Sequence, residues 1–202
     1  MPRARQPAYI AIDTGGTFTD CVWVEAGRVR MLKVFSTPED PSEAIAAALE
    51  KIGFRGPLVL LHGTTVGTNT LLQRKGARVA LVTTAGFEDA IEIGRQARPK
   101  LYDFFFDRVE PLVGSGLRFG VEERTASNGQ ILHRPSAGQL RRVARQIAAE
   151  HPEAIAVSLL FSFANPANER AVGRALEGLG VPLSVSHQIL PEFREYERTS
   201  TV

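Results

Sequence analysis

The sequence has a single cysteine, Cys21, so no disulfide can form within the chain. Its four histidines, at positions 62, 133, 151 and 187, are scattered and show no metal-ligand spacing. Neither a disulfide scaffold nor a histidine-rich metal site is indicated. The scarcity of cysteine favours a reducing compartment, so we expect a cytoplasmic protein in which Cys21 serves packing.

The sequence also lacks long apolar runs and an excess of charge of one sign. The longest apolar run, residues 154–163, is far shorter than the roughly 20 residues needed to span a bilayer, and the N-terminal run is interrupted at Asp13. Twenty-four basic and twenty-two acidic residues give a net charge of +2, and no stretch concentrates Lys and Arg. We therefore expect neither a membrane nor a nucleic-acid partner.

Apolar residues make up 44% of the 202 positions, which is enough for a core. Residues 9–12, 18–24 and 29–35 alternate like strands, and the short turns between them suit an antiparallel β-meander. Strand and helix then alternate, which indicates a parallel extension of the sheet. The order β-β-β-α-β-α-β-α is that of a ribonuclease-H-like fold, the unit repeated in actin-like ATPases and sugar kinases. The later elements are a helix over 42–53 with Ser42 as its N-cap, buried strands at 58–61 and 79–83, and helices over 66–74 and 87–93.

The second half of the sequence predicts a smaller α/β lobe. It begins with a hairpin whose turn contains Asn128 and Gly129, a pair that accommodates positive φ. We expect three regions: a ribonuclease-H-like lobe over 1–94, an irregular excursion or cap over 95–117, and the second lobe over 118–202. The final letters, EYERTSTV, suggest that the rest of a longer protein follows. The elements predicted in the second lobe are hairpin strands at 118–124 and 130–134, helices over 136–150 and 166–179, and strands at 154–160 and 183–186.

The segment DTGGTFTD, residues 13–20, places two adjacent glycines between two predicted strands. A turn without Cβ atoms lets backbone N–H groups approach an anion closely, and threonine hydroxyls add neutral donors. A phosphate held there would repel Asp13, so a bridging Mg²⁺, which prefers hard oxygen ligands, is part of the hypothesis. The alternative is an ordinary hairpin whose glycines satisfy turn geometry and whose threonines suit a strand. The candidates are Asp13, Thr17 and Asp20 for catalysis, Thr14, Gly15, Gly16 and Thr17 for phosphate or nucleotide binding, and Asp13 and Asp20 for the metal.

A second polar group of residues follows the strand predicted at 58–61. In open α/β sheets ligands gather at the carboxyl ends of strands, and a helix N-terminus presents unpaired N–H groups to anions. The alternative is that a threonine only caps the helix and that the histidine is half-buried and satisfied. Arg95 and Arg98, in a loop beside aromatic residues, could hold a carboxylate or phosphate bidentately or could be solvated or packed on the aromatics, and the latter is favoured for Arg98. Arg198 is a further candidate, which could instead lie in a solvated terminal segment. The candidate substrate-facing residues are His62, Gly63, Thr64, Thr65, Thr68, Asn69, Arg95 and Arg198.

Three strings, IAIDTGGTFTD, HGTTVGTNTLLQRKGARVALVTTAGFEDAIEIGRQARPKLYD and EYERTSTV, occur in that order and cover nearly the whole chain. Together they resemble the N-terminal region of the hydantoinase A and 5-oxoprolinase family, which includes the ATP-using subunits of acetone and acetophenone carboxylases. The resemblance implies an actin-fold ATPase that phosphorylates an amide or ketone carbonyl. It implies ATP and Mg²⁺ as cofactors, Asp13 beside the metal, residues 14–17 beside the phosphates and residues 63–69 near the reacting groups.

The leading hypothesis is the N-terminal part of an ATP-dependent hydrolase of cyclic amides, such as hydantoin or 5-oxoproline, working as an oligomer with a hydantoinase B-type partner. One alternative is the ATP-using subunit of a ketone carboxylase. Another is a nucleotide- or partner-binding module without turnover, because an actin-type ATPase closes its nucleotide between two lobes and the second is missing. We expect the isolated chain to be inactive. A Walker A protein is excluded, since no GxxxxGK[ST] string exists, and a sugar kinase is disfavoured by the later strings.

Overall fold

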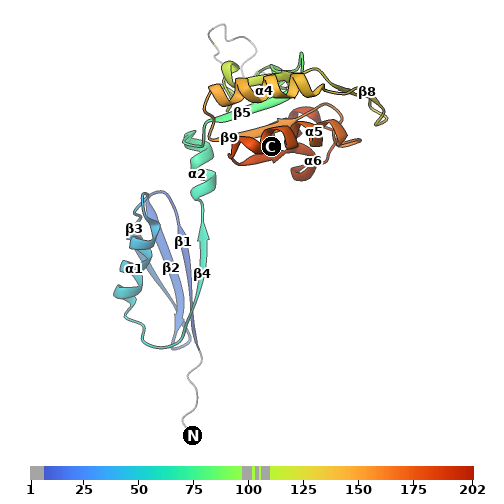
Figure 1. Cartoon of the computed structure of the whole chain (residues 1–202). Coiled ribbons are helices and arrows are strands. Elements are labelled where there is room, and N and C mark those ends of the chain that lie inside the picture. Colours follow the sequence, from blue (N-terminus) through green and yellow to red (C-terminus); the bar gives the residue numbers. More distant parts are fainter. Residues whose placement is uncertain (1–6, 97–101, 103–104, 106–109) are drawn as a thin grey trace. The chain divides into compact units, whose positions relative to one another are not determined.

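The computed structural model describes residues 7–96, 102, 105 and 110–202, and the chain divides into two compact units, Met1–Gly76 and Ala77–Val202 (Figure 1). Both units mix helices with sheets, as the α/β prediction requires. The boundary differs from the predicted one at residue 94, because the strand at Val79–Thr84 belongs to the second unit. Much of the predicted excursion over 95–117 lies outside the described residues.

The first unit is a four-stranded sheet with the order β3-β2-β1-β4. The pairs β1–β2 and β2–β3 are antiparallel, whereas β1 and β4 are parallel. This is the predicted meander with the first strand of its parallel extension, and the predicted ribonuclease-H-like order is followed in this unit as far as α2, because the strand at Val79–Thr84 belongs to the other unit. The elements are β1 (Ala8–Thr14), β2 (Phe18–Glu25), β3 (Arg28–Phe35), α1 (Pro41–Ile52), β4 (Leu58–Thr64) and α2 (Val66–Gln73).

Helix α1 begins one residue after Asp40, whose carboxylate accepts hydrogen bonds from the Ser42 backbone N–H at 2.9 Å and the Ser42 hydroxyl at 2.6 Å. Ser42 was predicted as the cap, but it is the donor and Asp40 the acceptor. Pro41 occupies the first turn, where its missing N–H is not needed. Gly53 ends the helix with a φ of 67°, as the sequence predicted.

One face of this sheet is covered by α1, and together they form the core of the first unit. Cys21 is fully buried there, and burial, with the nearby Asp20 charge, raises the pKa of its thiol. A buried thiol with a raised pKa is a poor nucleophile, which agrees with a packing role. The buried apolar residues of this core are Ile10, Ile12, Cys21, Val34, Ala44 and Ala48.

Strand β4 was predicted to be buried, but it is an edge strand paired with β1 alone in the described sheet. Its leucines Leu58, Leu60 and Leu61 are 36%, 38% and 55% exposed. The apolar run predicted burial because such runs usually have a neighbour on each side and a helix on each face. Strand β4 has a neighbour on one side only, within the described residues.

The second unit contains a parallel sheet of order β10-β9-β5-β6 and a two-stranded antiparallel sheet, β7-β8. Strands β5 and β9 are central. The strands are β5 (Val79–Thr84), β6 (Arg118–Val121), β7 (Arg124–Thr125), β8 (Ile131–His133), β9 (Ala154–Ser158) and β10 (Leu183–Val185). The helices are α3 (Ala90–Ile93), α4 (Ala137–Ala149), α5 (Ala167–Leu176), α6 (Ser186–Ile189), α7 (Glu195–Thr201) and the 3₁₀ turns Ser115–Leu117 and Glu177–Leu179.

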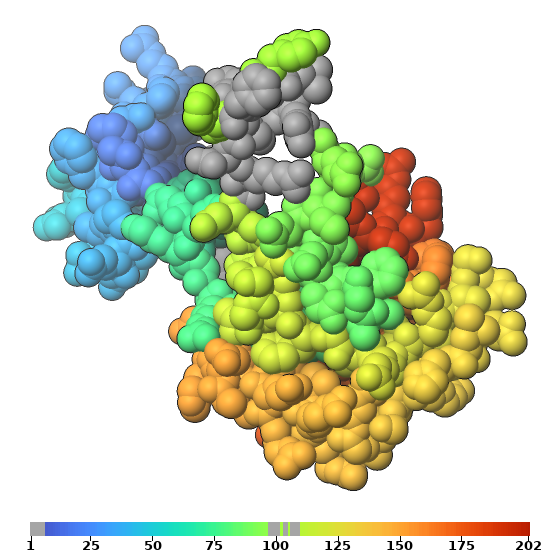
Figure 2. All heavy atoms as spheres, turned by 90° about the horizontal axis from the view of Figure 1, so that it is seen from above, coloured from blue at the N-terminus to red at the C-terminus, as the bar shows by residue number. Residues whose placement is uncertain are grey.

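Two layers of helices explain why β5 lies in this unit. Residues 80–84 are all buried, so the strand needs cover on both faces. Helices α4 and α5 pack on one face, around Val82 and Val157. On the other face Leu81 and Ala156 pack with residues from α3, the 3₁₀ turn and the C-terminus. The outer side of α4, orange in Figure 2, lies on the surface.

The predicted hairpin over 118–124 and 130–134 is only partly observed. Residues 118–121 form β6, which pairs in parallel with β5, from Leu81 opposite Arg118 to Thr84 opposite Val121. Only β7 and β8 pair as a hairpin, around the predicted turn in which Gly129 has a φ of 83°. None of the helices in the described part of the chain is both long and apolar enough to cross a bilayer.

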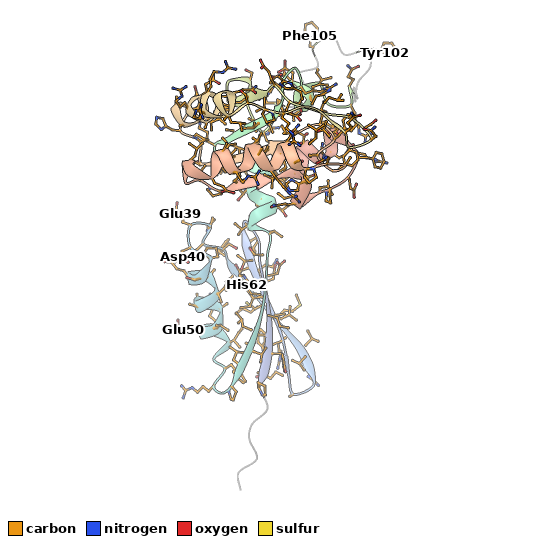
Figure 3. All side chains as sticks on the ribbon, turned by 45° about the vertical axis from the view of Figure 1, so that its right-hand side comes forward. Glu39, Asp40, Glu50, His62, Tyr102 and Phe105 are labelled. Atoms are coloured by element: carbon orange, nitrogen blue, oxygen red, sulfur yellow. The ribbon has the colours of Figure 1, made fainter. Side chains whose placement is uncertain are left out.

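The cap on α1 gives a testable prediction, since the only tryptophan, Trp23, reports on the first unit. Asp40 lies at the start of α1 beside Glu39, which has no capping bond (Figure 3). Asp40→Ala should lower the urea midpoint followed by Trp23 fluorescence at pH 7, while the control Glu39→Ala should leave it nearly unchanged.

The same variant predicts a pH dependence. The hydrogen bonds from the Ser42 hydroxyl and backbone lower the pKa of Asp40. Their stabilisation is therefore complete above the ordinary Asp pKa of about 3.9 and is lost as pH falls through the lower folded value. The midpoints of wild type and Asp40→Ala should converge on acidification, and a constant difference would contradict the cap.

Candidate phosphate and metal site

The turn between β1 and β2 is tightly closed at Gly15. Its N–H donates to the Phe18 carbonyl at 3.0 Å, and a Cβ added at Gly15 would also lie 3.0 Å from that oxygen. Any larger residue would crowd the backbone there. The N–H groups of Gly16 and Thr17 donate to no acceptor within the described residues. Two adjacent free donors at a tight turn can hold an anion.

Ser36, the residue after β3, is hydrogen-bonded to the backbone of this turn. Its hydroxyl donates to the Gly15 carbonyl at 2.8 Å and lies 3.0 Å from the hydroxyl of the buried Thr19. Its N–H donates to the Thr17 carbonyl at 2.9 Å. Sequence reasoning missed Ser36, whose role follows from the register that places its neighbour Phe35 opposite Phe18.

Asp13 and Asp20 face each other across the β1–β2 ladder and line one hollow of about 460 Å³ with Gly63. This hollow lies on the sheet face that α1 does not cover. The Asp20 carboxylate lies 3.1 Å from the Lys33 ammonium, and the Asp13 carboxylate has no partner among the described residues. Gly63 leaves room for Asp13, whose Oδ1 would be 3.7 Å from an added Cβ.

These two carboxylates fit a Mg²⁺ ion that is bound partly by phosphate oxygens and water, and not by protein side chains alone. The described residues include no group of three or more His, Cys, Asp or Glu side chains that could hold a metal by themselves. Mg²⁺ usually keeps several waters and is held by one or two carboxylates together with phosphate oxygens. The donor set therefore suits a metal that arrives with a nucleotide, and not a resident metal in a protein cage.

Thr14 connects the two predicted groups of residues, the glycine turn over 13–20 and the polar residues over 62–69. Strand β4 runs in register with β1, so that Asp13 is opposite Gly63 and Thr14 opposite Thr64. The buried Thr14 hydroxyl is hydrogen-bonded to His62 Nε2 at 3.0 Å, and the Thr14 carbonyl accepts from the Thr65 N–H at 3.2 Å. Figure 3 shows His62 on β4. The structure thus brings the glycine turn and the start of α2 together.

A second hollow, of about 520 Å³, lies on the other side of the glycine turn and is lined by Gly15, Gly16, Asn69 and Lys75 among others. The Asn69 amide donates to the Thr65 hydroxyl at 3.2 Å and would lie 3.4 Å from a Cβ on Gly16. Lys75, two residues after the end of α2, is a cation that sequence reasoning did not select. It adds positive charge beside the turn.

The remaining predicted residues of α2 are less involved. The Thr64 hydroxyl accepts from the Val66 N–H at 3.2 Å, so a local turn accounts for it. Thr65, the N-cap residue, makes no side-chain capping bond. Thr68 is exposed and lines neither hollow.

Arg95 and Arg198 belong to the second unit and have protein partners. Arg95 Nε donates to Glu197 at 2.5 Å, and this bond lowers the pKa of Glu197. Arg198 is fully buried, where it donates to the Leu159 carbonyl at 2.8 Å, to Ser186 at 2.9 Å, and to Ser162 and Glu195. Through the bond to Leu159, the residue after β9, Arg198 fixes α7 to the end of that strand.

The buried position of Arg198 gives a stability prediction. Arg198→Met removes the donors while keeping much of the volume, and leaves several buried acceptors without a partner. We expect it to lower the free energy of unfolding of the second unit by about 3 kcal/mol. Urea titration of the amide NMR signals of β9 measures this. The exposed Arg194→Met is the matched control, and equal losses for the two variants would refute the argument.

Comparison with known proteins places the chain. Residues 9–180 match the sequence profile of the family described as "Hydantoinase/oxoprolinase N-terminal region". An uncharacterized protein of Methanocaldococcus jannaschii is 40% identical, and the acetophenone carboxylase gamma subunit of Aromatoleum aromaticum is 36% identical; each match covers 95% of this chain and 30% of the relative.

A solved structure shows the same likeness. The ATP-dependent caprolactamase from Pseudomonas jessenii matches with a TM-score of 0.83 and 29% identity, covering 95% of this chain and 30% of that chain. The chain therefore spans about 30% of the length of these relatives. Because the profile covers most of its residues, the chain belongs to the hydantoinase/oxoprolinase family, of which it carries the N-terminal region.

Proposed function

We propose that this chain is the nucleotide-binding N-terminal part of an ATP-dependent hydrolase of cyclic amides. The observation that carries the proposal is the pairing of Asp13 with Asp20 beside a glycine turn whose Gly16 and Thr17 N–H groups have no acceptor among the described residues. An ordinary hairpin can also leave its central N–H groups free, but it has no need of two carboxylates facing each other beside the turn. The ATP dependence of the caprolactamase from Pseudomonas jessenii supports the same function.

In this proposal the turn holds phosphate and the carboxylates hold Mg²⁺. The N–H groups of Gly16 and Thr17, with the Thr17 hydroxyl, donate to phosphate oxygens, while Asp13 and Asp20 bind the metal directly or through its waters. Mg²⁺-ATP would supply a phosphoryl group whose transfer to the amide oxygen makes a poor electrophile reactive. Ser36 and Thr14 keep the donors fixed, so that little reorganisation is needed.

The start of α2 is proposed to face the reacting groups. His62 is held by Thr14, and Asn69 lies beside Gly16, so both are positioned relative to the phosphate turn. The Asn69 amide and the His62 ring, with the backbone of residues 63–65, could hold a substrate carbonyl. Lys75 lies on the same side as Asn69 and would attract the anionic nucleotide.

A second candidate is the ATP-using subunit of a ketone carboxylase. The 36% identity to the acetophenone carboxylase gamma subunit favours it. Both candidates use the same turn and differ in the acceptor of the phosphoryl group. Nucleotide hydrolysis by the longer protein that requires bicarbonate would select the carboxylase, and hydrolysis stimulated by a lactam alone would select the amide hydrolase.

Assembly and location follow from the same proposal. Relatives named as subunits support a partner, which we propose to be of hydantoinase B type within an oligomer. We further propose that the protein works in the cytoplasm. Turnover is expected from the full protein with its partner, since this chain spans about 30% of its relatives.

The direct test is isothermal titration of the chain with ATP and Mg²⁺. Asp13→Asn should weaken ATP binding at least ~10-fold, which is about 1.4 kcal/mol. When EDTA removes the metal, the variant and the wild type should bind ATP with the same affinity. Glu25→Gln, an exposed carboxylate at the far end of β2, is the matched control and should bind normally. Unchanged affinity in Asp13→Asn, or no binding by the folded longer protein that continues past Val202, would contradict the proposal.

A further inference from the structure

In the parallel sheet of the second unit, the chain leaves two neighbouring strands, β5 and β9, toward opposite edges of the sheet. Strands β5 and β9 are parallel neighbours. After β5 the chain continues to β6 on one side of the pair, and after β9 it continues to β10 on the other side. In open parallel sheets the crevice outside the carboxyl ends of two such strands is where ligands bind.

A hollow of about 390 Å³ occupies this crevice. Thr83, the last residue but one of β5, and Ser158, the last of β9, line it, and each is at most 4% exposed. Phe87 and Ile93, from the segment that follows β5, and Tyr196 of α7 form apolar walls. The size falls within the range of small-molecule sites, about 300–1,000 Å³.

The walls are held in place by contacts between α3 and α7. A Cβ added at Gly94 would lie 3.5 Å from the Tyr196 ring, so the absence of a side chain lets the ring pack there. The Ser158 and Thr199 hydroxyls lie 2.8 Å apart, which ties α7 to the sheet. Only one hydroxyl can donate in this bond, so the other keeps a proton for a ligand.

The charges at this hollow are balanced. Asp89 and Glu195 are its carboxylates. Asp89 accepts from Arg118, whose side chain is 2% exposed, at 2.8 Å, and Glu195 accepts from the buried Arg198. No Lys or Arg is among the residues described as lining the hollow. Among the lining residues a ligand with a net charge would find no unpaired counter-charge, whereas a neutral ligand with one donor and one acceptor would fit.

We infer that this hollow, defined by Thr83, Phe87, Ile93, Ser158 and Tyr196, binds a small neutral cyclic amide. A ring carbonyl would accept a hydrogen bond from a lining hydroxyl and the ring N–H would donate to another, while the methylenes pack on the apolar walls. The choice of an amide rests on the proposed function. The inference adds a second site, in a different unit from the phosphate turn, and a preference for neutral lactams over carboxylated ones such as 5-oxoproline.

The test is an amide NMR titration of the whole chain with ε-caprolactam, without nucleotide. Signals of residues 83–94, 158–160 and 195–199 should shift saturably, and 5-oxoproline should bind at least ~10-fold more weakly. Ala90→Phe, which fills the hollow, should abolish the shifts. Ala175→Phe, in a separate hollow beside α4 and α5, is the matched control and should not change them.

A smaller substitution tests the same site in case Ala90→Phe fails to fold. Ser158→Ala removes one hydroxyl and should weaken caprolactam at least ~3-fold with the NMR spectrum otherwise preserved. Shifts that occur elsewhere, equal binding of 5-oxoproline, or no shifts in the folded wild type would overturn the inference. Because nucleotide is absent, a chain that binds ATP through Asp13 but shows no lactam shifts would refute this site alone.

Discussion

The arrangement of the first unit depends on the register of β1 with two neighbours that run in opposite directions. Pairing with β2 places Asp13 opposite Asp20, and pairing with β4 places it opposite Gly63. A slip of one residue would turn both carboxylates toward α1 and into the core. The burial of Ile10 and Ile12 against α1 prevents that slip, so the apolar core determines where the candidate site lies.

The second unit is organised around buried polar groups at the end of β9. Glu169 is fully buried and accepts from the Leu159 N–H at 3.0 Å, the Ser186 hydroxyl at 2.6 Å and the His187 N–H at 2.9 Å. Arg198 shares Ser186 with it. Charged groups in a core are tolerated only when such bonds replace water. This network fixes α6 and α7, and α7 forms a wall of the inferred amide site.

Much of this could be predicted because local patterns agree with the fold. The meander, α1 with its Gly53 end, and the meeting of the glycine turn with residues 62–69 follow from periodicity, turn residues and the rule for parallel strand ends. The assignment of β5 to the second unit could not, because burial on both faces is a property of its neighbours. Ser36 and Lys75 were missed since single polar residues carry no periodic signal. Arg198 was selected as a substrate-facing candidate, and its buried bonds to Leu159 and Ser186 could not be predicted because these partners are 39 and 12 residues away in the sequence.

The central claim is that the glycine turn and the two aspartates hold a metal nucleotide. The most direct measurement is paramagnetic broadening of the amide NMR signals of the chain by Mn²⁺-ADP, with Mg²⁺-ADP as the diamagnetic reference. The account predicts that the signals of residues 13–20 and of Gly63 broaden first, and that Asp13→Asn removes this selectivity. Selective broadening at another surface, or uniform broadening of all signals, would contradict it.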